Sequence, residues 1–241
     1  MAEFKFPTEE VELPSKGLLY PEGHPLKSGK IEIKYMTAKE EDILSNSSYI
    51  QKGIVLDKLL ESVIVTKVPL KDLLIGDKNA ILIAARILGY GATYKVTING
   101  EEERVDLTQL ENKPFDESYI VNGQNEFSFT LPNSGNLITF KMLDGHDEAK
   151  IEAELKGLAK INKEHVPTLT TRLKFTITSI DGDTEKKTIR EFVDGYLLAR
   201  DSRSLREHIK NQQPDVDMSY TLDNGEEVEI PLGLTFFWPD F

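Results

Sequence analysis

The chain has 241 residues and a net charge of −12, from 29 Lys and Arg against 41 Asp and Glu. Hydrophobic residues make up 39% and charged residues 29%, which is typical of a folded protein and argues against wholesale disorder. No apolar run reaches the ~18–20 residues of a membrane helix, and acidic residues interrupt the N-terminal stretch, so neither a membrane span nor a signal peptide is expected. The absence of cysteine excludes disulfides, thiolate nucleophiles and cysteine-ligated metals.

The acidity is concentrated in two segments, both of which we predict to contain β-hairpins. Residues 211–241 carry seven acidic and no basic residues, and residues 101–126 carry eight acidic against two basic ones. These acids fit solvated strand faces that keep hairpin edges from pairing with other sheets. They also fit an acidic surface that selects a basic partner, and both interpretations stay open. A net negative chain argues against binding to nucleic acid.

The N-terminal segment, residues 1–30, predicts an extended arm. Its prolines forbid a helix, and its apolar residues distinguish it from a disordered tail. The arm can lie on the chain's own surface or on a partner's. The alternation over residues 30–35 then predicts a strand.

The next segment predicts helices followed by a hairpin. Thr37 and Glu40 have capping-box spacing, so a helix is expected to begin there. A second helix is expected over residues 53–65. A buried helix over residues 78–88 is expected to be capped by Asp77 and ended by Gly89 or Gly91. Residues 93–106 predict a hairpin that turns at Asn99-Gly100.

The second half of the chain continues the mixed pattern. The elements expected there are strands over residues 126–131 and 137–142, a helix over 146–162, a strand over 172–180, an amphipathic helix over 185–199, a short helix capped by Asp201 or Ser202, and a hairpin over 218–230 that turns at Asn224-Gly225. The two Asn-Gly hairpins resemble each other. An internal repeat and two ordinary hairpins explain this equally well.

We therefore predict an α+β protein, a helical body with two β-hairpin modules and an extended N-terminal arm. The expected divisions are residues 1–30 (arm), 31–92 (first helical part), 93–143 (first β module), 144–213 (second helical part with a short strand) and 214–241 (C-terminal hairpin and aromatic tail).

The sequence offers no catalytic or cofactor-binding motif. It has no Walker loop, dinucleotide fingerprint or nucleophile elbow, and its four histidines lack metal-ligand spacing. No catalytic residue, cofactor or metal is therefore expected, and we predict a non-enzyme. A hydrolase whose site is assembled from distant carboxylates stays open as a third hypothesis. The basic residues near 200–210 indicate a solvated helix face with internal ion pairs.

Apolar residues near both ends are the candidate partner-binding residues. They are Leu13, Pro14, Leu18, Leu19, Tyr20 and Pro21 in the arm, and Phe236, Phe237 and Trp238 at the C-terminal end. An exposed aromatic cluster would risk aggregation, so it must be buried somewhere. Burial within the chain and docking into a partner are the two alternatives, and aromatic anchors often dominate interface energies.

Several segments together resemble the T4-type bacteriophage baseplate hub family of contractile tails. They are Leu13 to Pro21, Ile31 to Leu44, Asp201 to Arg206, Pro214 to Met218, and the ending Phe237-Trp238-Pro239. The resemblance implies a hub subunit or hub assembly factor that contacts phage hub or tail proteins. It places the chain in the host cytoplasm during assembly, or in the tail baseplate of the virion.

The resemblance does not extend to metal ligands. Members of the family can carry Cys-x-x-Cys knuckles near the two hairpin tips, where this chain has Asn99-Gly100 and Asn224-Gly225. An Asn-Gly turn can close a hairpin that a metal would otherwise close. The alternative function is an acidic adaptor that binds a basic partner through its β-hairpins.

Overall fold

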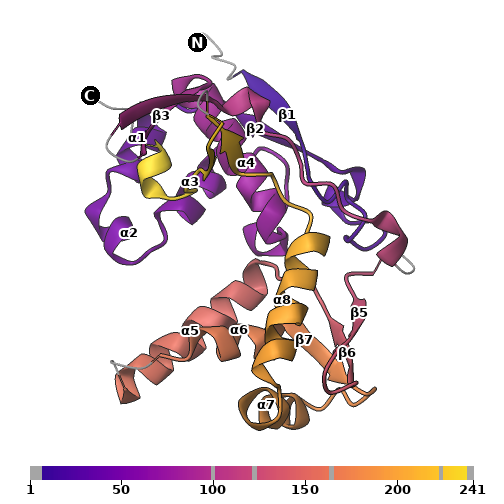
Figure 1. Ribbon diagram of the computed structural model, residues 1–241. Coiled ribbons are helices and arrows are strands. Elements are labelled where there is room, and N and C mark those ends of the chain that lie inside the picture. Colours follow the sequence, from indigo (N-terminus) through magenta and orange to yellow (C-terminus); the bar gives the residue numbers. More distant parts are fainter. Residues whose placement is uncertain (1–6, 99–100, 121–123, 163–165, 223–224, 238–241) are drawn as a thin grey trace.

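The computed structural model describes residues 7–98, 101–120, 124–162, 166–222 and 225–237. The predicted α+β class is confirmed (Figure 1). The described helices are α1 (Ala38–Leu44), α2 (Ser47–Gln51), α3 (Val55–Val63), α4 (Ile75–Tyr90), α5 (Gly145–Ile161), α6 (Thr168–Thr176), α7 (Lys186–Gly195) and α8 (Ala199–Gln212). The strands are β1 (Thr8–Glu12), β2 (Lys30–Lys34), β3 (Thr93–Ile98), β4 (Glu101–Asp106), β5 (Phe127–Thr130), β6 (Leu137–Phe140), β7 (Ile177–Ile180), β8 (Ser219–Thr221) and β9 (Glu227–Glu229).

The strands form four small antiparallel sheets. Their strand orders are β1-β2, β3-β4, β5-β6-β7 and β8-β9. The predicted arm is therefore part of the fold, because β1 pairs with β2. Buried side chains from Leu13 to Phe237 form one continuous hydrophobic core.

The start of α1 confirms the predicted capping box. The Thr37 hydroxyl accepts from the Lys39 N–H, and the Glu40 carboxylate accepts from the Thr37 N–H at 2.8 Å. Two donors at the helix start are thereby satisfied.

Two predicted helix caps are wrong. Asp77 and Asp201 are each the third residue of a helix, since α4 begins at Ile75 and α8 at Ala199. The residues that occupy the cap positions, Leu74 and Leu198, make no side-chain cap bond. The two carboxylates instead accept hydrogen bonds from distant turns, which local sequence cannot reveal.

The strand predicted over residues 172–180 is also mostly wrong. Helix α6 runs to Thr176, and only β7 is extended. Leu169, Leu173 and Thr176 share one helical face, and this period competes with the alternation that suggested a strand. Leu173 and Thr176 are buried.

One structural module occurs twice, first from β1 to α4 and again from β5 to α8. Each copy opens with a hairpin, β1–β2 or β5–β6, and continues into a capped helix, α1 or α5. The second hairpin strand has an additional partner in each copy, Ile33 with Ile64 and Phe140 with Ile177. Each copy ends in a long helix, and an antiparallel hairpin follows it.

The turn of the opening hairpin has the same design in both modules. It reads Leu-Pro-Ser-Lys-Gly at residues 13–17 and Leu-Pro-Asn-Ser-Gly at residues 131–135. Both final glycines have a left-handed backbone, with φ of 74° at Gly17 and 80° at Gly135, a conformation that strains other residues. The Leu13 N–H donates to Gly29 and the Leu131 N–H to Asn136, the residues just before β2 and β6.

An ion pair at the start of the capped helix also recurs. The Lys34 ammonium lies 2.9 Å from the Glu40 carboxylate, and the Lys141 ammonium lies 2.6 Å from the Asp147 carboxylate. Both acids are the third residue of their helix and are almost fully buried. The repetition therefore extends well beyond the two Asn-Gly hairpins that suggested it.

Two of the differences between the modules are insertions. Residues 18–28 follow Gly17 in the first module, whereas Gly135 in the second module is followed directly by Asn136. The second module contains α7 between β7 and α8, where the first has only the 3-10 helix Leu70–Asp72.

Candidate functional site: a groove between the two modules

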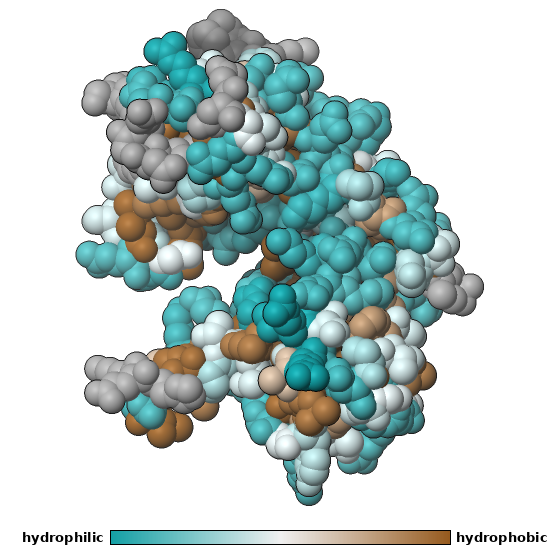
Figure 2. All heavy atoms as spheres, viewed as in Figure 1, coloured by the Kyte–Doolittle hydropathy of each residue, from teal (hydrophilic) through white to brown (hydrophobic). Residues whose placement is uncertain are grey.

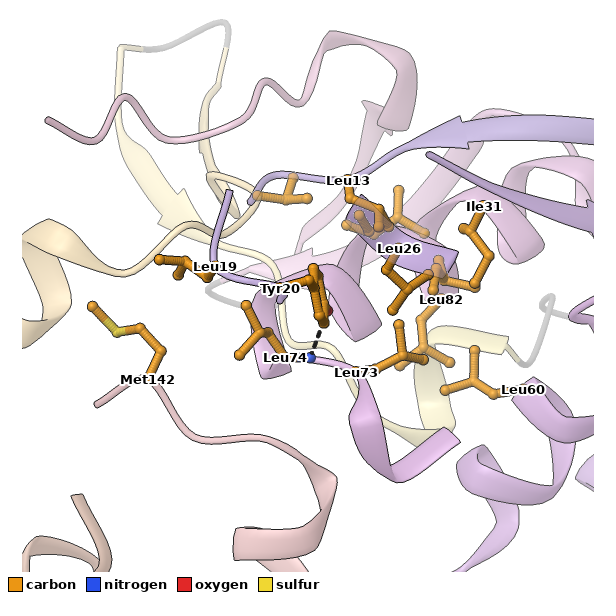
Figure 3. Close-up of a cluster of buried hydrophobic side chains, with 14 of the residues drawn as sticks. Leu13, Leu19, Tyr20, Leu26, Ile31, Leu60, Leu73, Leu74, Leu82 and Met142 are labelled. Carbon is orange, nitrogen blue, oxygen red and sulfur yellow. Dashed lines mark hydrogen bonds between the residues drawn. The ribbon is translucent and has the colours of Figure 1, made fainter. Parts of the chain in front are cut away.

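A buried carboxylate holds the turn of the first module against the start of α4. The Asp77 carboxylate accepts from the Ser15 N–H at 2.9 Å and from the Ser15 and Tyr20 hydroxyls, both at 2.7 Å. The Tyr20 oxygen accepts from the Leu74 N–H at 3.0 Å, the bond drawn in Figure 3. Because this carboxylate lies in the first turn of α4, the helix dipole also favours its negative charge.

Asp201 makes the corresponding contacts in the second module. Its carboxylate accepts from the Asn133 N–H at 2.9 Å, from the Asn133 side-chain amide at 2.8 Å and from the Ser134 N–H at 3.0 Å. The bonds from Ser15 and Asn133 thus occupy matching positions. We call these two sets of bonds the aspartate latches.

The two latches differ in electrostatics. Burial raises the pKa of the Asp77 carboxyl, and hydrogen bonds from Ser15 and Tyr20 only partly oppose this shift. Burial, together with the charge of Asp77, also raises the pKa of the Tyr20 hydroxyl. At Asp201, hydrogen bonds from Asn133 and Ser134 outweigh the effect of burial, so its pKa lies below the usual value. Both carboxylates are fully buried, but the donors of the first latch are buried as well, whereas Asn133 and Ser134 are exposed, so the first latch is the drier one.

The latched start of α4 is also where the two modules join. Leu74 pairs with Asp144 in a short antiparallel bridge. The Ile75 N–H donates to the Leu143 carbonyl at 3.3 Å, and the Gly145 N–H donates to the Leu73 carbonyl at 3.2 Å. We call this contact the internal junction. It connects the start of α4 in the first module to the start of α5 in the second.

A groove runs between the modules beside this junction. It consists of two hollows, of about 410 Å³ and 520 Å³, which share Ile75 and Arg172. Figure 2 shows a hollow between the α2–α3 region and the projecting α5–α6 pair, with apolar residues on both sides. Apolar lining comes from Leu74, Met142, Leu169, Leu173 and Ile209 in the first hollow and from Ile50, Val55, Leu56, Leu82, Leu232 and Leu234 in the second.

Basic residues gather in the first hollow of an acidic protein. They are Lys113, Lys141, Arg172, Arg206 and Lys210. Lys141 and Arg172 form ion pairs with Asp147 and Glu148 of α5. Lys113 and Lys210 form no direct ion pair with any residue that the structure describes, although both lie close enough to Asp217 for their charges to help lower the pKa of its carboxyl.

The residues predicted to bind partners are mostly part of the chain's own core. Leu13, Pro14, Leu19, Tyr20, Phe236 and Phe237 are buried within the chain, several of them in the cluster of Figure 3. Of the two alternatives for these six side chains, burial within the chain is the one that the structure shows. Leu18 is half-buried, Pro21 is exposed, and Trp238 lies outside the described residues.

The reason for this burial is that both ends pack on α4. The insertion is tied to the start of α4 through Tyr20. At the other end, Phe236 packs against Tyr94, and its carbonyl accepts from the Arg86 side chain at 3.0 Å. A deletion of residues 1–30 would consequently remove core side chains and could not test a docking arm.

The two acidic segments meet in space. Asn112 pairs with Val216, the Lys113 N–H donates to the Asp215 carbonyl, and the Asp217 N–H donates to the Glu111 carbonyl. Glu102, Glu226 and Glu227 are exposed on the hairpins that flank this contact. The acidity that is split in sequence is brought together in the fold.

The histidines do not form a metal site in the part of the chain that the structure describes. His24 and His146 both contact the Asp72 carboxylate, at 3.3 and 2.9 Å, and His208 stacks on Phe129. His165 lies outside the described residues. No cluster of three potential metal ligands occurs in the described ranges, and within them no helix is both long and apolar enough to cross a membrane.

Sequence reasoning missed the groove and the latches. One signal was present, since Leu-Leu precedes each latch aspartate at the same spacing, at residues 73–74 and 197–198. The groove itself has no such signal, because it exists only between two packed modules. No family model, no curated protein and no solved structure matches this chain.

Proposed function

We propose that this chain is a non-enzymatic component in the assembly of a contractile-tail baseplate hub, and that it binds hub or tail proteins through the groove between its modules. The sequence resemblance suggests the type of partner. The groove supports the proposal because it exposes apolar side chains on two facing walls.

Exposed apolar side chains inside a concave surface are typical of protein-binding sites. Leu169 in the first hollow is 45% exposed, and Ile50 in the second hollow is 37% exposed. Lys113 and Lys210, which also line the first hollow, would give specificity by electrostatic complementarity. This charge pattern favours an acidic, apolar segment of the partner.

Co-purification from infected cells tests the proposal. Tagged wild-type protein is expected to retain hub or tail proteins, identified by mass spectrometry. Leu169→Glu places a charge in the groove and is expected to abolish this retention. The matched control is Ile161→Glu at the end of α5, where the side chain is 86% exposed and outside the groove. The proposal fails if wild type retains no such proteins, or if both variants retain them equally.

The second candidate function is an acidic adaptor for a basic partner. The observation in its favour is the contact between the two acidic segments at Asn112 and Val216. A double reversal, Glu102→Lys with Glu227→Lys, is expected to abolish salt-sensitive binding in this case. It leaves groove-mediated binding intact, so one pull-down series separates the two functions.

A further inference from the structure

The internal junction joins two different surfaces, so each module has a second surface that the junction leaves unused. The junction uses the start of α4 from the first module and the start of α5 from the second. By the module repetition, the start of α8 matches the start of α4, and the start of α1 matches the start of α5. These two matching edges lie on different modules of the same chain.

The unused edges have the backbone conformation of the used ones. Leu74 and its match Leu198 have φ/ψ of −64°/151° and −61°/143°. Asp144 and its match Thr37 have −110°/−179° and −125°/177°. Both unused residues are therefore already in the extended form that the bridge requires.

The unused edges also have free hydrogen-bond donors. At the internal junction the donors are the N–H groups of Ile75 and Gly145. The matching N–H groups, of Ala199 and Ala38, donate to no residue that the structure describes. Both alanines are exposed.

Apolar exposure distinguishes the two helix starts. Leu74 is 5% exposed at the internal junction, whereas its match Leu198 is 51% exposed. Tyr196, two residues before it, is 72% exposed. The start of α8 is thus open, whereas the matching start of α4 is covered by the start of α5.

We propose that copies of this chain associate head to tail through these edges, so that Leu197–Ala199 of one copy pairs with Met36–Ala38 of the next, with Leu198 opposite Thr37. The partner is a second copy because the chain itself carries the matching edge. Since the two surfaces differ, the contact is heterologous and each copy keeps one of each surface available, which leads to a ring or a filament.

One residue weakens the proposed contact relative to the internal one. A Cβ atom at Gly145 would lie 2.8 Å from the Cα of Lys71 across the internal junction. The residue that matches Gly145 is Ala38, which carries that Cβ atom. The edges therefore have to shift apart slightly, and Ala38→Gly is expected to strengthen association.

Cross-linking tests the proposal cleanly because the chain has no cysteine. Residues opposite each other in this type of bridge are close enough for a disulfide. A mixture of Thr37→Cys and Leu198→Cys proteins is expected to give disulfide-linked dimers on mild oxidation. The control mixture pairs Thr37→Cys with Lys187→Cys, an exposed position on α7. A single chain with Leu74→Cys and Asp144→Cys is the positive control, forming an intrachain disulfide.

A clear excess of dimer in the first mixture over the control mixture supports the proposal, and equal yields overturn it. Sedimentation velocity gives a second measure without cysteines. Ala38→Gly is expected to associate at a lower concentration than wild type, and Leu198→Glu is expected to stay monomeric. If Leu198→Glu and wild type sediment alike at every concentration, the proposal is wrong.

Discussion

The two modules use the same latch but surround it differently. In the first module the inserted residues 18–28 bring Tyr20 onto Asp77 and cover the start of α4. In the second module the shorter turn leaves Asn133 and Ser134 exposed, and the start of α8 stays open. The comparison shows that the same helix start can be a buried contact between modules in one copy, at α4, and an accessible edge in the other, at α8.

The largest expected difference between the modules comes from removing each latch carboxylate. Asp77→Ala leaves the buried donors of Ser15 and Tyr20 without an acceptor, and we expect it to cost about 2–4 kcal/mol of stability. Asp201→Ala is expected to cost less, because water reaches the exposed turn at Asn133 and Ser134. Urea unfolding of both variants measures the loss in the free energy of unfolding. Equal losses would show that the insertion does not make the first latch drier.

A smaller effect is expected at the recurring ion pair. Glu40 accepts from Thr37, Ser62 and Lys34, and these hydrogen bonds outweigh burial and lower the pKa of Glu40 to about 2. Glu40→Gln is expected to cost about 1–3 kcal/mol near neutral pH.

The pH dependence of this variant gives an internal control. A lowered pKa in the folded state means that Glu40 contributes its full stability above about pH 4.5 and loses it as the pH falls toward 2. The stability difference between wild type and Glu40→Gln should therefore shrink over this range. A difference that does not change with pH would contradict the charged role of Glu40.

A smaller effect again is expected at Tyr20. Tyr20→Phe removes the hydroxyl that links Leu74 to Asp77, and we expect a loss of about 1–2 kcal/mol. Tyr196→Phe is the matched control, because that ring is 72% exposed and its loss should stay within about 0.5 kcal/mol. Thermal unfolding followed by circular dichroism compares the two variants. Similar melting temperatures would show that the Tyr20 hydroxyl does not stabilise the fold.

The smallest expected effect is a difference in the sign of pH dependence between the two latches. Because its folded-state pKa is raised, Asp77 contributes stability at low pH that is lost as the pH rises above about 4. Asp201 has a lowered pKa, so its contribution is present above about pH 4 and lost below it. Asp77→Asn and Asp201→Asn should therefore change the slope of stability against pH in opposite directions, and the same direction for both would contradict this assignment.

The sequence predicted the parts of the fold that depend on local chemistry. The capping box at Thr37 and Glu40 is one example, because it involves residues on one helix turn. The latch aspartates show the limit, since Asp77 bonds to a residue 62 positions away and Asp201 to one 68 positions away. The sequence predicts both as helix caps because a carboxylate near a helix start has that role when no distant donor competes.

The candidate site was less predictable than the fold. Buried residues such as Leu13 and Phe236 looked like docking residues because sequence shows that a side chain is apolar but not what covers it. The groove could not be predicted because its walls come from residues far apart, such as Leu56 and Arg172. The sequence suggests the module repetition mainly through two similar hairpins, because the other matching motifs, Leu-Pro-x-x-Gly and the Leu-Leu pair, are short and far from those hairpins.

Hydrogen–deuterium exchange of Asp77→Ala and Asp201→Ala tests the central claim, that each module is held by its own matching latch. The account predicts that Asp77→Ala speeds exchange in residues 13–20 and leaves residues 131–136 unchanged, whereas Asp201→Ala does the reverse. Faster exchange in both turns of either variant, or in neither, would contradict the claim.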